Sequence, residues 1–170
     1  SDAAAAIPSE YATWKNNYFR ACGDGLTAGI WNGGGVFSEG IGYGMLITAN
    51  AGSQADFDAV YQFYQRAEKS AAGLLNWTCN FDQNACSLSC SGNGATDADL
   101  DIAAALLMAA KRWGGTYRDA ARALIVTLRA AVVESCGTIL DIRPGDVWGG
   151  CTDPGNGLIN PSYYSPGYYR

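Results

Sequence analysis

The chain has 170 residues, 48% of them hydrophobic and 16% charged, so it is long enough to bury a core and too apolar to be disordered. A net charge of −5, scattered basic residues and the absence of any apolar run of roughly 18 residues argue against a nucleic-acid partner and a membrane span. The chain has no histidine, which excludes histidine-based triads, dyads and zinc sites, so hydrolytic chemistry would require carboxylates, a lysine or a metal.

Helices that alternate with long loops are predicted along the chain. Helical spacing predicts helices over residues 11–21, 39–50, 96–113 and 117–135, and a further helix that begins after Ser53. Loops rich in glycine, proline or cysteine are predicted at 23–37, 71–94 and 137–166. This pattern indicates an all-α fold in one domain, residues 1–170, with function in the loops.

The cysteines are even in number and include no CxxC pair, which favours structural disulfides over a zinc site. They are Cys22, Cys79, Cys86, Cys90, Cys136 and Cys151. Cys136 and Cys151 flank one turn-rich excursion and are the preferred pair. The three cysteines of segment 79–90 crowd one loop, so at least one bridge is expected there. Disulfides require an oxidising compartment, and a secreted or periplasmic location is therefore expected.

The first chemically distinctive segment is Ser38-Glu39-Gly40-Ile41-Gly42-Tyr43-Gly44-Met45. Each glycine in a helix costs about 1 kcal/mol relative to alanine, and such a cost fits a place where backbone or ligand approaches closely. Glu39 falls in the first helical turn, so one interpretation is an ordinary helix-terminal glutamate that follows a Ser38 cap. The other is a general acid, which needs burial and a second carboxylate nearby.

The second distinctive segment is 95–103, with sequence Ala-Thr-Asp-Ala-Asp-Leu-Asp-Ile-Ala. Thr96 and Asp99 have the spacing of a capping box, which would make the acidic residues purely structural. On a helix, Asp97 and Asp101 share one face while Asp99 points elsewhere, so the three carboxylates cannot all serve one site.

No metal or cofactor is expected. The Asp-x-Asp-x-Asp pattern of segment 97–101 is similar to the start of an EF-hand calcium loop. However, Ile102 and Met108 occupy the positions where that loop needs a glycine and a bidentate glutamate.

Aromatic residues in the predicted loops are candidates for stacking on the apolar face of a sugar ring. They are Trp31, Trp77, Trp148, Tyr163 and Tyr164. Core packing is the alternative for any one of them. Carboxylates, loop aromatics, the lack of histidine and the disulfides together favour a glycosidase.

These segments resemble glycoside hydrolase family 8. Segment 38–45 resembles the acid-bearing motif of the family, and segment 95–113 is similar to its signature helix. Segments 144–150 and 160–163 also resemble family segments, in the order and spacing of the family. The resemblance extends from Trp14 to Arg170.

The resemblance implies an (α/α)6 barrel, of which this chain would supply about half, and inverting hydrolysis of β-1,4-linked polysaccharides. Glu39 matches the general acid, and Asp97 matches the aspartate that holds the sugar at the cleavage subsite. Asp99 and Asp101 are expected to cap or brace their helix. The residues that match substrate-binding aromatics are Tyr43, Trp77, Trp148 and Tyr163.

Two departures from the family pattern matter. Members of the family are much longer, and their catalytic base comes from the later half, so here it is expected outside this chain. A complementary C-terminal half, on the same chain, a nicked chain or a second chain, is therefore the expected partner, since half a barrel would expose apolar helix faces. In addition, the cysteine-rich insert 79–90 is unlike that of other members.

The expected substrate is a polysaccharide, and a cellulose-like β-1,4-glucan is favoured. Chitosan and xylan are the alternatives within the family, and specificity would depend largely on the second half. Two further alternatives are a carbohydrate-binding relic without catalysis and a helical structural protein held by disulfides.

Overall fold

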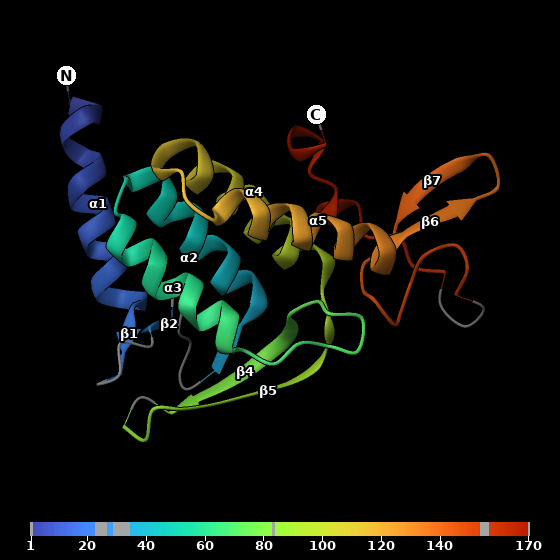
Figure 1. The fold of residues 1–170 in the computed structure, drawn as a ribbon, viewed down its shortest axis with the longest axis horizontal. Helices are drawn as coiled ribbons and strands as arrows, with labels where there is room; N and C mark the ends of the chain where they lie inside the picture. The colour runs from blue at the N-terminus through green and yellow to red at the C-terminus, as the bar shows by residue number, and fades with distance from the viewer. Residues whose placement is uncertain (1, 23–26, 29–34, 83, 154–156, 170) are drawn as a thin grey trace.

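The computed structural model describes residues 2–22, 27–28, 35–82, 84–153 and 157–169. Within these ranges, helices account for close to half of the chain (Figure 1). They are α1 (Asp2–Tyr18), α2 (Ser38–Ala51), α3 (Gln54–Arg66), α4 (Thr96–Trp113) and α5 (Tyr117–Val132). None of the described helices is long and apolar enough to cross a bilayer.

Helical hairpins form the framework, as predicted. A short turn at Gly52 and Ser53 joins α2 to α3, and the segment from Gly114 to Thr116 joins α4 to α5. The first helices of the two hairpins, α2 and α4, make the most extensive contact, and α3 and α5 pack against them from outside (Figure 1). The described residues form these two hairpin layers and do not close a barrel.

The prediction of an all-α fold was too narrow, because the expected loop at 71–94 forms a β-hairpin. Strands β3 (Gly35–Phe37), β4 (Asn76–Asp82) and β5 (Ser87–Gly94) form an antiparallel sheet in that order. Burial alternates from Thr78 to Asp82 in β4, which is the period of a half-buried strand. The hairpin was not predicted from the sequence because β5 is rich in serine and glycine, and neither residue type favours strands.

Among the described residues, two further strand pairs lie outside this sheet. A short pair, β1 (Arg20–Ala21) and β2 (Thr27–Ala28), follows α1. A second hairpin, β6 (Val133–Cys136) and β7 (Ile139–Ile142), follows α5. Two short 3-10 turns, η1 (Pro161–Tyr163) and η2 (Pro166–Tyr168), come last.

Two disulfides connect cysteines of the described residues, and both agree with the sequence-based expectation. Cys79 and Cys90 are opposite each other in β4 and β5, with their Cα atoms 4.0 Å apart, and are bonded. The preferred pair, Cys136 and Cys151, also forms a disulfide. The remaining cysteines, Cys22 and Cys86, belong to neither of these two bridges and pack at the hydrophobic core.

The helix boundaries differ from prediction at several ends. Helix α1 covers 2–18 rather than 11–21 and includes Pro8, and α5 ends at Val132 rather than at residue 135. Ser53 is the N-cap of α3, as expected, but its side chain makes no capping hydrogen bond.

The caps predicted at the start of α2 and α4 are wrong. Phe37 is the N-cap of α2, and the Ser38 hydroxyl donates instead to Glu39 Oε2 at 3.2 Å. Ala95 is the N-cap of α4, and the Thr96 hydroxyl donates to the Arg143 carbonyl oxygen at 2.6 Å. Both hydroxyls are fully buried and find partners other than their own helix backbone.

The close contact of α2 with α4 depends on Gly42. A Cβ atom at this position would lie 3.0 Å from Asp101 Cβ and 3.1 Å from the Ala98 carbonyl oxygen. Such distances leave no room for a side chain, so glycine lets the two helix backbones meet. Glycine destabilises a helix, but at this position it is needed because the backbones of α2 and α4 come so close together.

Replacing Gly42 with valine should lower the free energy of unfolding by about 2 kcal/mol, because the added side chain overpacks the α2–α4 contact. Urea denaturation measures this effect. The control is Asn50→Val, an exposed position on the same helix, for which a change within about 0.5 kcal/mol is expected. Equal stability of both variants would contradict the proposed contact.

Candidate active site

Two acidic residues lie within electrostatic reach of each other at the starts of α2 and α4. Glu39 lies in the first turn of α2 and Asp97 in the first turn of α4, and both are half-buried. Burial, and after it the charge of Glu39, raise the pKa of Asp97 to about 6. The electrostatic effect of Glu39 on Asp97 indicates that the two predicted site residues share one environment.

A cavity of about 320 Å³ opens beside Glu39. It is lined by Glu39, Trp77, Asn93, Gly94, Ala95, Trp148 and Tyr163. The cavity therefore brings together one predicted acid and three of the predicted aromatic residues, which come from four separate segments of the chain. Asn93 was missed by the sequence analysis, since its position depends on the pairing of β4 with β5.

Among the described residues, Asp97 and Tyr43 do not line this cavity, but both interact electrostatically with Glu39. The pKa of Tyr163 is raised by burial and then by the charges of Asp97 and Glu39. The pKa of Tyr43 is raised by burial and then by Asp101, Asp97 and Glu39. Both phenols thus lie within the electrostatic reach of the two acids, and Tyr43 is 48% exposed and open to a ligand.

Glycines position Trp148 in the cavity wall. A Cβ atom at Gly145 would overlap the indole nitrogen of Trp148 at 2.1 Å, so the indole lies directly on the backbone of Gly145. Gly149 and Gly150 follow with φ of 72° and 82°, a region that favours glycine. Gly145 also pairs with Ala95 in an isolated β-bridge, which attaches this segment to the start of α4.

Trp77 lies beside an aromatic residue that sequence analysis missed. The rings of Phe37 and Trp77 stack with centroids 5.2 Å apart and an interplanar angle of 12°. Phe37 pairs with Thr78 across β3 and β4, two strands that are distant in the chain. No local signal in the sequence identifies this partner.

Buried carboxylates brace the cavity walls from behind. Asp99 is fully buried and accepts a hydrogen bond from the Leu75 N–H at 3.0 Å, and burial raises its pKa to about 7. Asp146 accepts from the Gly94 N–H, also at 3.0 Å. Asp99 therefore braces α4, as expected from the resemblance to the family. It does not complete the capping box that its spacing from Thr96 suggested.

The structure also confirms how the three aspartates of α4 are arranged. Asp101 is half-buried on the side of Tyr43 and Asp97, and its Oδ1 accepts a hydrogen bond from the Tyr168 hydroxyl at 2.9 Å. Asp99 points into the core instead.

Two further aromatic candidates do not line the cavity. The Tyr164 hydroxyl donates to Asp141 Oδ1 at 2.5 Å, which holds that side chain against β7. Trp31 lies outside the described residues.

One cluster of described residues has donors of the metal-binding type, namely Glu134, Cys136 and Cys151. Since the two cysteines form a disulfide, their sulfur atoms cannot act as thiolate ligands. The cluster therefore does not define a metal site.

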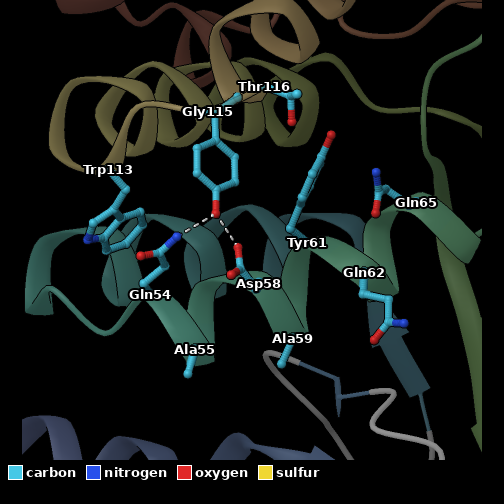
Figure 2. Close-up of a pocket in the computed structure, with 11 residues that line it drawn as sticks. Gln54, Ala55, Asp58, Ala59, Tyr61, Gln62, Gln65, Trp113, Gly115 and Thr116 are labelled. Atoms are coloured by element: carbon cyan, nitrogen blue, oxygen red, sulfur yellow. Dashed lines mark hydrogen bonds between the residues drawn. The ribbon is translucent and has the colours of Figure 1, made fainter.

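A larger groove of about 770 Å³ lies between α3 and the α4–α5 turn (Figure 2). The Tyr117 hydroxyl donates to Asp58 and accepts from Gln54 Nε2 at 3.2 Å, as Figure 2 shows. These polar groups bond to one another, and none of the predicted site residues lines the groove. The Glu39 cavity is therefore the candidate active site.

Half-buried carboxylates among indole and phenol rings are typical of glycoside hydrolases, which act through acidic side chains. Comparison with known proteins identifies the family. The model of glycosyl hydrolases family 8 matches residues 1–170, and the chain belongs to this family.

Relatives and solved structures agree with this membership. The chain is 34% identical to endoglucanase A of Acetivibrio thermocellus over 178 residues, which cover 100% of this chain and 36% of the relative. It resembles the structure of the endo-β-1,4-glucanase CMCax from Acetobacter xylinum, with a TM-score of 0.68, 29% identity, and coverage of 84% of this chain and 44% of the other.

A cold-adapted family 8 xylanase in complex with substrate has the same fold. It gives a TM-score of 0.74 at 19% identity, with coverage of 96% of this chain and 45% of the xylanase. The chain thus spans less than half the length of each of these three proteins.

Replacing Glu39 with glutamine should lower the pKa of Asp97 from about 6, because a neighbouring negative charge is removed. The pKa should stay above its ordinary 3.8, since burial remains. ¹³C NMR titration of the Asp97 carboxyl measures the change, with Glu10→Gln on the exposed side of α1 as the control.

The same substitution should change how stability depends on pH. An aspartate whose pKa is higher in the folded than in the unfolded protein stabilises the fold as the pH falls from about 6 to about 4. Glu39→Gln should make this gain smaller. An unchanged Asp97 titration would show that the two acids do not interact.

Proposed function

We propose that the protein of which this chain is part hydrolyses a β-1,4-glucan internally, with Glu39 as the general acid. The observation that carries this proposal is the cavity in which Glu39 lies among Trp77, Trp148 and Tyr163. Flat aromatic rings suit the C–H faces of sugar rings, and a carboxyl group between them is in place to meet a glycosidic oxygen. The names of the relatives support the choice of glucan.

In the proposed reaction, the Glu39 carboxyl donates its proton to the glycosidic oxygen as the bond from that oxygen to the anomeric carbon breaks. Water attacks the same carbon from the opposite face, and a second carboxylate takes a proton from the water, so the configuration is inverted. In an inverting enzyme the two carboxyl groups are about 6.5–9.5 Å apart, which leaves room for the water.

We assign Asp97 to sugar positioning rather than to the role of base. Asp97 lies in the first turn of α4, within electrostatic reach of Glu39, and its carboxylate can accept hydrogen bonds from sugar hydroxyl groups. The base is proposed to come from a segment outside this chain.

Chitosan and xylan remain alternative substrates, and the similarity to a family 8 xylanase supports the second at the level of fold. Release of reducing sugars from carboxymethylcellulose, chitosan and xylan distinguishes them. Binding of these polymers without turnover would favour a carbohydrate-binding relic.

Glu39→Gln in the full protein should lower kcat on carboxymethylcellulose by about a thousandfold, because the amide cannot donate the catalytic proton. Affinity for a short cello-oligosaccharide should change little, because the shape of the cavity is kept. Glu10→Gln serves as the matched control and should retain full activity. Undiminished hydrolysis by Glu39→Gln would refute the assignment.

We also propose that a complementary C-terminal half covers α4 and α5. An apolar groove of about 740 Å³ runs along these helices, and its lining includes Leu100, Met108 and Ile142. Leu107 and Ile125, 44% and 42% exposed, also line it. An apolar surface of this kind is typical of an interface. The greater length of the relatives supports a further part of the same fold as the occupant.

Leu107→Lys should therefore destabilise the full protein by about 2 kcal/mol, since a charge would be buried under the covering segment. The control is Val126→Lys, at a position on α5 that is 68% exposed and outside the groove. Thermal unfolding measures both variants.

Mass spectrometry of the natural protein under denaturing, reducing conditions gives a second test. A longer chain or an additional chain is expected. A lone, monomeric species of 17.9 kDa would contradict the complementary half.

The proposed location is extracellular or periplasmic. Both disulfides of the described residues fit an oxidising compartment, where such bonds form and persist.

A further inference from the structure

The outward face of the β3–β4–β5 sheet carries an ordered set of polar side chains. Cross-strand partners share a face, and Thr78 pairs with Ser91 and Asn80 with Ser89. Ser89, Ser91 and Asn80 are exposed, and Thr78 is half-buried. We call these four residues the polar rows. They are uncharged, and their hydroxyl and amide groups can both donate and accept hydrogen bonds.

The polar rows begin at the aromatic pair of Phe37 and Trp77. These rings are 38% and 44% exposed, although they are large and stacked on each other. Phe37 is the cross-strand neighbour of Thr78, so the pair lies on the same face as the rows. Trp77 also lines the Glu39 cavity. The aromatic pair therefore connects the cavity with the polar rows.

Backbone geometry keeps the aromatic pair flat on the sheet. Gly92 has φ of 100°, and a Cβ atom there would lie 3.1 Å from Cδ1 of Trp77. A side chain at this position would push the indole away. The irregular register between Asn76 and Thr78 turns Trp77 to the outward face.

The opposite face of the sheet is fixed to the core. Val36, Cys79 and Cys90 are paired across the strands and are all buried, and the two cysteines form a disulfide. The Cys90 N–H also donates to Glu68 Oε2 at 2.6 Å. The outward face is thus a rigid surface rather than a loose hairpin.

We infer that this face binds the part of a neutral β-1,4-glucan chain that extends beyond the Glu39 cavity. The inference rests on the function proposed above and adds a binding surface to it. The aromatic pair would stack on one sugar ring, and the polar rows would bond the hydroxyl groups of the next rings. The strand from Trp77 to Asp82 is about 17 Å long, enough for several sugar residues.

The polar rows carry no charge, and the face ends at one carboxylate, that of Asp82. The nearest carboxylate in β4 is Asp82, and its Oδ1 accepts hydrogen bonds from the Asn84 and Ala85 N–H groups of the turn. The rows themselves offer no charge to a glucosamine chain.

Calorimetry with cellotriose and cellohexaose tests the inference in full protein carrying Glu39→Gln, which prevents turnover. Cellohexaose should bind about tenfold more tightly than cellotriose. Adding Asn80→Ala and Ser89→Ala should weaken cellohexaose binding about tenfold, the effect of losing about two net hydrogen bonds, and leave cellotriose unaffected. Gln62→Ala, an exposed amide on α3, is the matched control and should change neither affinity.

A second measurement does not depend on the variants. In NMR spectra, the Asn80 side-chain amide signal should shift with cellohexaose and stay in place with cellotriose. If cellotriose binds and cellohexaose gains nothing, or if the Asn80 signal does not move, the inference is overturned and the proposed function stands. If neither sugar binds, the proposed function fails first.

Discussion

The contact between α2 and α4 at Gly42 is the constraint on which the rest of the structure depends. Because Gly42 has no side chain, the backbone of α2 approaches α4 so closely that a Cβ atom at this position would crowd Asp101 and Ala98. Gly42 of α2 lies against Asp101 of α4. Glu39 lies one turn before Gly42, and Asp97 lies one turn before Asp101. The helix contact therefore places both acids at the same end of the helix pair, within electrostatic reach of each other. The other helices pack on the outside of this pair.

Grouping acidic residues in this way costs electrostatic free energy. Burial and like charges raise the pKa values of Asp97 and Asp99 to about 6 and about 7. The charge of Lys69 lowers the pKa of Asp99, and burial lowers the pKa of Lys69 itself to about 8. Hydrogen bonds from backbone N–H groups to Asp99 and Asp146 offset part of this cost.

The site could be predicted from the sequence better than the sheet beside it. Glu39, Trp77, Trp148 and Tyr163 belong to segments whose order resembles a family, and the structure places them around one cavity. Helix positions also followed from apolar spacing. The β4–β5 hairpin did not, because serine and glycine weaken the strand signal, and Phe37 depends on a pairing between strands far apart in the chain.

The two disulfides have a consequence for how the protein matures. Cys79 and Cys90 are separated by 11 residues, and Cys136 and Cys151 by 15, so each bridge closes a local loop. Closing a loop of 15 residues stabilises a fold by about 3 kcal/mol through the unfolded chain. Each thiol can meet its partner as soon as its own short segment has been synthesised. Oxidation can thus proceed in chain order, without waiting for distant parts of the polypeptide to assemble.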